Sequence, residues 1–345
     1  MSNVFPKLHN ATWPGVVGKG PDSEPFISLD KMIDMTAKAE VNGSKFDGVD
    51  LFLSEPHVSI DSSKDDIKLL VDKLRVNNLD AGSVVAPVWK DNGGGSAMGS
   101  SDDRNNFLTQ VEKACKIAQT LREFGVRPNG IVRIDSATDV ESWSKNPLEN
   151  TKLIADTFKK ATDIAIDYGE KLAAEGEICW GGMHSWKWML RTLELSDREG
   201  NLGFQADLAH SMLYLLGYNA EDHRILPKDF NWEDKEVFDD AYKKMTDALS
   251  PWTIDLHIAQ NDGTVKGMGS HDKTGKHCLA DDPNGKLDIN HASSFWLKDS
   301  NGNQRQDIKH ICWDGCMFPN STLQKQNTWD VILDTMLSVR DEFGW

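Results

Sequence analysis

Four short apolar runs in the second half of the chain each end in acids or histidines. The residues concerned are Glu175 and Glu177, Asp207 and His210, His257, and Asp314. Runs of this length are typical of buried strands, and neighbouring parallel strands bring their ends to one edge. Carboxylates mixed with imidazole suit Mn²⁺, Mg²⁺, Co²⁺ or Zn²⁺, with positions left open for substrate oxygens. The pattern predicts a divalent-metal site, and among these ions we favour Mn²⁺.

Each of these signals has a simpler interpretation when it is taken alone. Glu175 and Glu177 are two apart on one expected strand, so both carboxylates face one space and need a cation or protons. Alternatively, one or both bind loop amides or an arginine. Asp207 and His210 could form a salt bridge and a helix cap, and His257 could be a satisfied core histidine. Four such strand ends in register favour the metal site.

Apolar runs alternate with amphipathic segments along the whole chain. Before the acid-bearing strands, the pattern predicts strands at 7–13, 46–53, 81–88 and 130–135. It predicts a helix from about residue 29 and further helices at 65–76, 107–121, 151–168, 184–195, 234–248 and 323–341.

About eight βα units favour a closed (β/α)8 TIM barrel over an open sheet. No shift in composition marks a boundary, so we expect residues 1–345 to form a single domain. Active sites of such barrels lie at the carboxyl ends of the strands, where the acids are. The polar, turn-rich segment 263–295 is expected to be a long loop after strand seven that folds over the barrel mouth.

With these residues in place, the chain resembles the xylose isomerase-like TIM barrel superfamily, and most of all its sugar phosphate isomerase/epimerase group. The resemblance implies metal ligands on four strands, which match Glu175 (Glu177 less well), Asp207, His257 and Asp314. It also matches Asp207 and His210 to the Asp-x-x-His element of strand six. The family ligand on strand eight is usually glutamate, so Asp314 is one methylene shorter.

The predicted chemistry is metal-assisted proton transfer through an enediolate on a keto or hydroxy sugar. Glu175 would remove the proton beside the carbonyl, and Asp314 would return it to the same carbon or its neighbour, giving an epimerase or an isomerase. His210 would hydrogen-bond a substrate oxygen or orient Asp207. A leaving group beta to the carbanion would make the enzyme a lyase or dehydratase instead.

Other polar and aromatic residues near the acids are candidates for binding the sugar substrate. They are Glu177, Trp180, His184, Lys187 and His277, the last in the polar loop 271–277. Trp186, Trp188 and Trp313 also stand close to the acids in the sequence and are expected to line a pocket.

The composition narrows the function classes further. The chain has 345 residues with a net charge of −16, which repels nucleic acid and anionic lipid. No apolar run is long enough to span a membrane. Five unevenly spaced cysteines indicate free thiols, and the first residues show no signal-peptide pattern, so we expect a cytoplasmic protein.

Three alternatives remain open at this point. An endonuclease of the related fold would need a basic face and more metal-binding histidines. At the ends of strands two and three, His57 is the only nearby candidate. A non-catalytic sugar-binding barrel would not need converging carboxylates. A subunit of a partner-dependent lyase is the third, and the sequence leaves a homo-oligomer open.

Overall fold

Eight parallel strands close into a barrel in the computed structural model, which describes residues 4–266 and 274–345. Around the barrel the strand order is β1, β10, β7, β6, β5, β4, β3, β2. The bounds are β1 Lys7–Ala11, β2 Gly48–Phe52, β3 Asp80–Val85, β4 Val132–Ile134, β5 Leu172–Glu175, β6 Leu202–Asp207, β7 Thr253–Ile258 and β10 His310–Trp313. The predicted (β/α)8 TIM barrel is confirmed.

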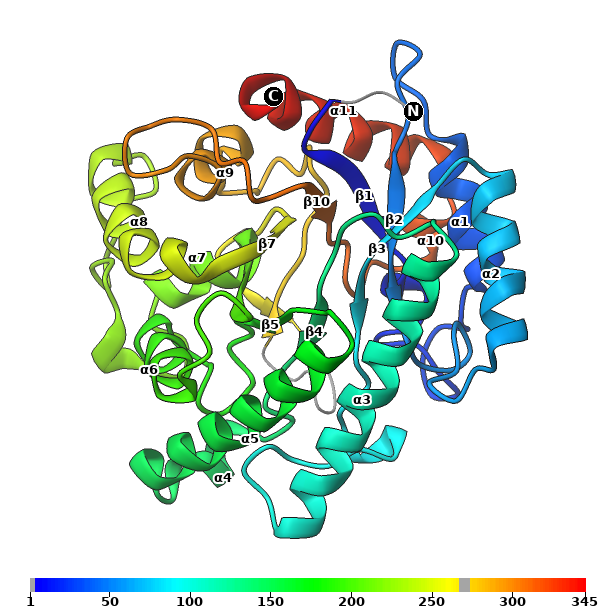
Figure 1. The fold of residues 1–345 in the computed structure, drawn as a ribbon. Coiled ribbons are helices and arrows are strands. Elements are labelled where there is room, and N and C mark those ends of the chain that lie inside the picture. Colours follow the sequence, from blue (N-terminus) through cyan, green and yellow to red (C-terminus); the bar gives the residue numbers. More distant parts are fainter. Residues whose placement is uncertain (1–3, 267–273) are drawn as a thin grey trace.

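Helices surround the strands in chain order, as Figure 1 shows by its colours. The longer ones are α1 Leu29–Lys38, α2 Lys64–Val76, α3 Ser101–Glu123, α5 Pro147–Asp167, α6 Trp186–Ser196, α8 Lys235–Leu249 and α11 Gln326–Phe343. Short helices α4 Val140–Ser144 and α10 Asn320–Leu323 precede α5 and α11. None of the described helices is both long and apolar enough to cross a lipid bilayer.

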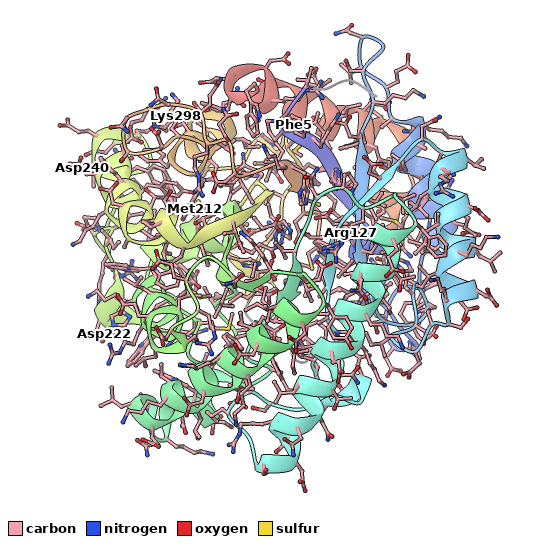
Figure 2. The ribbon with its side chains drawn as sticks, viewed as in Figure 1. Phe5, Arg127, Met212, Asp222, Asp240 and Lys298 are labelled. Carbon is pink, nitrogen blue, oxygen red and sulfur yellow. The ribbon has the colours of Figure 1, made fainter. Side chains whose placement is uncertain are left out.

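Local signals explain where the helices begin. The hydroxyl groups of Ser63 and Ser100 each accept a hydrogen bond from the third backbone N–H of α2 and α3. The carboxylates of Asp66 and Asp103 in turn accept one from the backbone N–H of Ser63 and Ser100, which forms two capping boxes. The apolar faces then pack inward: Phe107 of α3 stacks on Phe158 of α5 with ring centroids 6.1 Å apart. Charged residues such as Asp222, Asp240 and Lys298 lie on the outside (Figure 2).

Besides the short helices α4 and α10, two helices were not predicted from the sequence. Helix α7, Leu208–Leu215, follows β6 with no intervening loop, so its start was hidden at the strand end. Helix α9, Ile289–Leu297, occupies the end of the segment expected to be a loop. Asp288 caps α9, and Ile289, Ala292 and Trp296 bury one face, so helical spacing was present there.

The remainder of the predicted loop 263–295 contains a small antiparallel hairpin. Its strands are β8, Val265–Lys266, and β9, Thr274–Gly275. Of the polar loop 271–277, residues 271–273 lie outside the described residues. The loop expectation therefore holds for the residues between β7 and α9 that the structure describes, apart from this hairpin.

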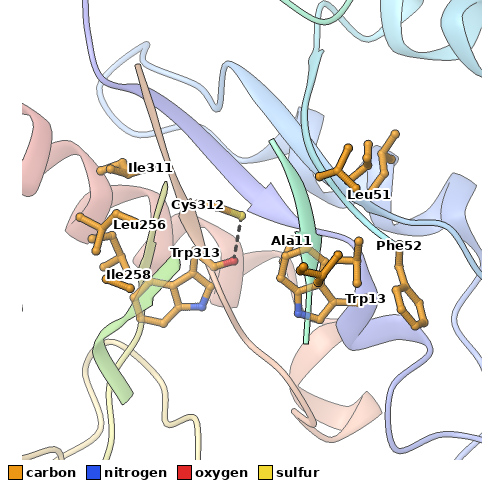
Figure 3. Packing of buried hydrophobic residues seen from close by; sticks show 14 of the residues in the cluster. Ala11, Trp13, Leu51, Phe52, Leu256, Ile258, Ile311, Cys312 and Trp313 are labelled. Atoms are coloured by element: carbon orange, nitrogen blue, oxygen red, sulfur yellow. Dashed lines mark hydrogen bonds between the residues drawn. The ribbon is translucent and has the colours of Figure 1, made fainter. Parts of the chain in front are cut away.

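The buried interior of the protein combines apolar and polar side chains. Figure 3 shows Trp13 and Phe52 close to Ala11 and Leu51, and Ile258 close to Leu256, in the buried cluster. A polar layer fills the middle of the barrel with His9, Asp50, Ser83, Gln205, Asp255 and His310, all buried. A Cβ on Gly82 would lie 2.2 Å from Asp50 Oδ1 and 2.3 Å from His9 Nδ1, so glycine makes room for this layer.

Replacing Phe158 by alanine should destabilise the fold by about 3–5 kcal/mol, because it leaves a cavity between α3 and α5. Urea unfolding measures the change. Leu148→Ala on the same helix is the control: Leu148 is 67% exposed, and its loss should cost no more than about 0.5 kcal/mol. Equal losses in the two variants would contradict the packing described for α5.

Candidate active site

Four of the predicted residues converge at the carboxyl ends of the strands. Glu175 ends β5, Asp207 ends β6, His257 lies near the end of β7 and Asp314 follows β10. Their ligand atoms all lie within 4.8 Å of one another, and all four residues are buried. His257 Nδ1 is 3.6 Å from Glu175 Oε1, 3.8 Å from Asp207 Oδ2 and 3.6 Å from Asp314 Oδ2.

The chemistry of this cluster fits a divalent cation. Within the described part of the chain, Glu175 Oε1 and both ring nitrogens of His257 are buried without a hydrogen-bond partner. Buried polar atoms rarely stay unsatisfied, because losing water without a replacement costs free energy. A cation between three carboxylates and one imidazole would satisfy Glu175 Oε1 and His257 Nδ1, the ring nitrogen that faces the carboxylates. This donor set suits Mn²⁺, Mg²⁺ or Zn²⁺.

Arg133 on β4 joins the two glutamates that were predicted to share a space. Its Nη2 forms an ion pair with Glu175 Oε2 and another, at 2.7 Å, with Glu177 Oε1. The alternative that the glutamates bind an arginine is therefore confirmed for both. Glu175 also converges with Asp207, His257 and Asp314. Glu177 lies beyond the end of β5, so the expectation that both glutamates belong to the strand was wrong.

The helix cap at this position is Asp207, whereas the simpler interpretation of the pair had assigned the cap to His210. Asp207 is the N-cap of α7: its Oδ1 accepts from the backbone N–H groups of Ala209, at 2.8 Å, and His210, at 3.0 Å. Its Oδ2 faces His257 and His277 instead. The Asp-x-x-His spacing is thus a helix cap that also fixes one carboxylate oxygen towards the cluster.

Asp314 is held in a similar way from one side. Its Oδ1 accepts from Trp13 Nε1 at 3.0 Å and from the Cys316 backbone N–H at 2.7 Å. Its Oδ2 then lies towards His257 and towards His277 Nε2, which is 3.9 Å away. The Trp13 ring also lies beside His257, with centroids 5.3 Å apart, so this tryptophan orients two of the four residues.

His277 and His210 border the cluster from the side of α7 and the β9 hairpin. Burial opposes protonation of His277, but the facing carboxylates of Asp314 and Asp207 raise its pKa to about 9. Burial lowers the pKa of His210, and this effect outweighs the attraction of Asp207. The two rings meet edge to face at 5.1 Å. One cationic and one neutral imidazole thus stand beside the carboxylates.

A layer of polar residues supports His257 from below. Its Nε2 lies 4.0 Å from Asp255 Oδ2, two residues earlier on the same face of β7. Asp255 in turn contacts Gln205 Nε2, Ser83 Oγ at 3.3 Å and His310 Nε2 at 3.6 Å. Such carboxylate–histidine contacts set the orientation of an imidazole ligand.

A small cavity of about 10 Å³ lies among these side chains, room for about one water molecule. Residues from all eight βα units line it: Trp13, Val17, Phe52, Trp89, Arg133, Glu177, His210, Thr274, Asp314 and Cys316. Among the predicted residues, Glu177, His210 and Asp314 therefore border one space.

The remaining predicted residues lie at different distances from this centre. Trp180 lines a separate, larger cleft at the barrel mouth. His184 is buried against Trp143, with centroids 4.5 Å apart, and Lys187 is exposed with its ammonium over the Trp186 ring. Among the described residues, neither side chain contacts the four clustered residues, so we include neither of them in the proposed site.

The tryptophans expected beside the acids divide in the same way. Trp313 is fully buried in the core, while Trp186 donates to the His223 carbonyl and Trp188 packs on Trp143. The cavity is lined by Trp13 and Trp89 instead. All five cysteines are free thiols, as expected, and His57 is hydrogen-bonded to the Ile27 carbonyl at 2.7 Å.

Arg133 and Trp13 are two residues of the site that the sequence did not reveal. A signal for Arg133 existed, because an arginine in the apolar strand Val132–Ile134 needs a buried partner. Trp13 gave no comparable signal, since it meets Asp314 only when the first and last strands of the barrel pair.

Comparisons with known proteins agree with the fold. No protein-family model and no curated protein sequence matches the chain. Among solved structures, it is similar to a D-tagatose 3-epimerase-like protein, with 15% identity, a TM-score of 0.61, and coverage of 97% of this chain and 98% of the other.

Two further solved structures are similar along nearly the whole chain. One is a xylose isomerase-like TIM barrel protein from Mycobacterium smegmatis in complex with magnesium, with 13% identity, a TM-score of 0.60, and coverage of 98% and 97%. The other is the 3-keto-D-glucoside 4-epimerase from E. coli, with 11% identity, a TM-score of 0.56, and coverage of 96% and 99%. The chain therefore has the xylose isomerase-like TIM barrel fold.

Replacing Asp255 by asparagine should weaken binding of Mn²⁺ by about 10–100-fold, because the orientation of His257 is no longer fixed by a carboxylate. Isothermal titration calorimetry with MnCl₂ measures the dissociation constant. The exposed Asp229→Asn variant makes the same change of charge far from the barrel interior and should bind like the wild type. An unchanged constant in Asp255→Asn would remove this residue from the support of the site.

Proposed function

We propose that the protein is a metal-dependent sugar isomerase or epimerase that works by proton transfer at a carbon beside a carbonyl group. The observation that carries the proposal is the convergence of four buried ligand groups at the barrel mouth, with atoms of Glu175 and His257 left unsatisfied. A barrel that only binds sugar needs no such group of carboxylates, because neutral hydrogen-bonding groups and aromatic rings suffice.

Glu175, Asp207, His257 and Asp314 would hold the metal ion, with Mn²⁺ favoured. When bound, such an ion polarises substrate oxygens and stabilises negative charge that develops on them. The magnesium complex of the similar M. smegmatis protein supports a divalent ion in this fold. Glu177 is the less suitable ligand on this side of the barrel, because Glu175 and not Glu177 converges with Asp207, His257 and Asp314. Glu177 also accepts a hydrogen bond from Cys179.

The protein's own groups would move the proton. Glu175 Oε1 and Asp314 Oδ2 both lie 3.6 Å from His257 Nδ1 and come from strands β5 and β10, which β6 and β7 separate. Two carboxylates that approach a substrate from different directions can act as base and acid in turn. Glu175 would take a proton from the carbon, and Asp314, after taking up a proton from solvent, would deliver that second proton to the same carbon or its neighbour. Loss of the first proton from Glu175 to solvent would restore both carboxylates.

Neighbouring groups would hold the sugar and balance charge. The guanidinium of Arg133 offsets the charges of Glu175 and Glu177. His210 lines the cavity with its Nδ1 buried and, within the described residues, unpaired, so it can bond a substrate oxygen. His277, whose ring meets that of His210 edge to face, would add a cationic hydrogen-bond donor. The known epimerases of similar fold support a sugar as the substrate.

Glu175→Gln should lower the rate of proton exchange with solvent by at least about 10²-fold, because the amide cannot act as a base. The assay follows deuterium incorporation from D₂O into a panel of ketoses by NMR, with metal content measured in the same samples. Glu199→Gln, at an exposed position, is the matched control. Full exchange by a variant that retains its metal would remove Glu175 from the role of base.

Adding Mn²⁺ should stabilise the wild-type fold by about 2.7 kcal/mol when the ion is present at about 100 times its dissociation constant. Asp207→Ala should abolish this gain. The comparison is made with and without Mn²⁺ within each variant, so the cost of losing the α7 cap cancels. Asp234→Ala, which removes the cap of α8, should keep the full gain. No stabilisation of the wild type by any divalent ion would favour the non-catalytic sugar-binding alternative.

A further inference from the structure

A second and much larger space opens at the barrel mouth beside the metal cluster. This outer cleft has a volume of about 890 Å³ and is lined by the segments that follow β3, β4 and β5, together with Asn219. Small-molecule sites usually have volumes of about 300–1,000 Å³. The inner cavity, which Asp314 lines together with Glu177 and His210, has only about 10 Å³. The outer cleft therefore has the capacity for a ligand group that the inner cavity lacks.

The outer cleft and the inner cavity share a wall. Trp89 lines both spaces, and its ring stacks on that of Trp180 with centroids 6.4 Å apart and an interplanar angle of 28°. Cys179 lines the outer cleft and donates through Sγ to Glu177 Oε2 at 3.2 Å, while Glu177 lines the inner cavity. Trp89, Glu177 and Cys179 thus form the wall between the two spaces, and a molecule that occupies both must displace the Trp89 indole.

The charge of the outer cleft selects what it can hold. Four acids line it, Asp91, Asp103, Asp139 and Glu141, against one lysine among the described residues, Lys90. Lys90 Nζ is already paired with Asp103 Oδ1 at 3.1 Å. A phosphate would meet net repulsion here. Hydroxyl groups of a neutral sugar ring can donate to these carboxylates, and the tryptophans offer an apolar surface for its C–H groups.

We infer, resting on the proposed function, that the substrate is an unphosphorylated sugar with a second neutral glycosyl group, which the outer cleft binds. The keto-sugar end reaches the metal cluster, and the glycosyl end lies over the segments that follow β3, β4 and β5. The protein thus acts on glycosylated ketoses of disaccharide size in preference to free or phosphorylated monosaccharides.

The test is equilibrium binding to the full-length protein in the presence of Mn²⁺, by isothermal titration calorimetry. The probes are fructose, fructose 6-phosphate and four disaccharides that carry a glycosyl group on fructose: turanose, maltulose, isomaltulose and lactulose. At least one disaccharide should bind about tenfold or more tightly than fructose, which corresponds to about 1.4 kcal/mol. Fructose 6-phosphate should bind no more tightly than fructose.

Two variants locate the binding energy in the outer cleft. Trp180→Ala removes part of its wall, and Ser142→Trp fills it from a partly exposed position on α4 with little risk to folding. Both should reduce the disaccharide-to-fructose affinity ratio towards one. The control Trp188→Ala removes a tryptophan that does not line the cleft, and should keep the ratio.

Each outcome separates this inference from the proposed function. Equal affinities for all sugars, no binding of any disaccharide, or strongest binding of fructose 6-phosphate would overturn the outer-cleft inference. Solvent deuterium exchange into fructose would still support the isomerase or epimerase proposal in that case. A disaccharide preference that depends on Trp180 and Ser142, without exchange into any ketose, would support the cleft and contradict the enzymatic proposal.

Discussion

The structure depends on how it neutralises several carboxylates buried in one small space. Glu175, Glu177, Asp207 and Asp314 all lie out of contact with bulk water around His257. Like charges at such distances repel strongly where the dielectric constant is low. Arg133 compensates the two glutamates from β4, and burial opposes ionisation of Asp207 and Asp314, whose pKa values the neighbouring histidines nevertheless hold low. A divalent cation would complete this balance, and the four groups that converge at the strand ends could bind it.

Hydrogen bonds to one carboxylate oxygen hold Asp207 and Asp314 in place, and the other oxygen of each carboxylate lies towards His257. Oδ1 of Asp207 accepts hydrogen bonds from the first backbone N–H groups of α7. Oδ1 of Asp314 accepts hydrogen bonds from Trp13 Nε1 and the Cys316 backbone N–H. Beneath them, the polar layer connects His257 to Asp255, His310, Asp50 and His9 through the barrel interior. A barrel interior filled only with aliphatic side chains could not orient an imidazole from below. The polar layer is thus part of the site as much as of the fold.

Much of this could be predicted from the sequence, because the decisive signals are local. Strand and helix periodicity identified the barrel, and residues at strand ends of a parallel barrel must meet, which brought Glu175, Asp207, His257 and Asp314 together. Contacts that depend on barrel closure or on side-chain packing were out of reach. Trp13 meets Asp314 across the closing strand pair, and Arg133 reaches over to Glu175. His184 stands near the acids in sequence but packs on Trp143, a contact that periodicity does not encode.

The most direct test of the metal centre is a crystal structure of the protein grown with Mn²⁺, with anomalous diffraction used to locate the ion. We expect one strong anomalous peak bonded to Glu175, Asp207, His257 and Asp314, with ligand distances of about 2.0–2.2 Å typical of such ions. Asp255 should remain behind His257, and Arg133 should remain on Glu177. A structure with no peak between these four side chains, or with manganese bound only elsewhere, would contradict the central claim.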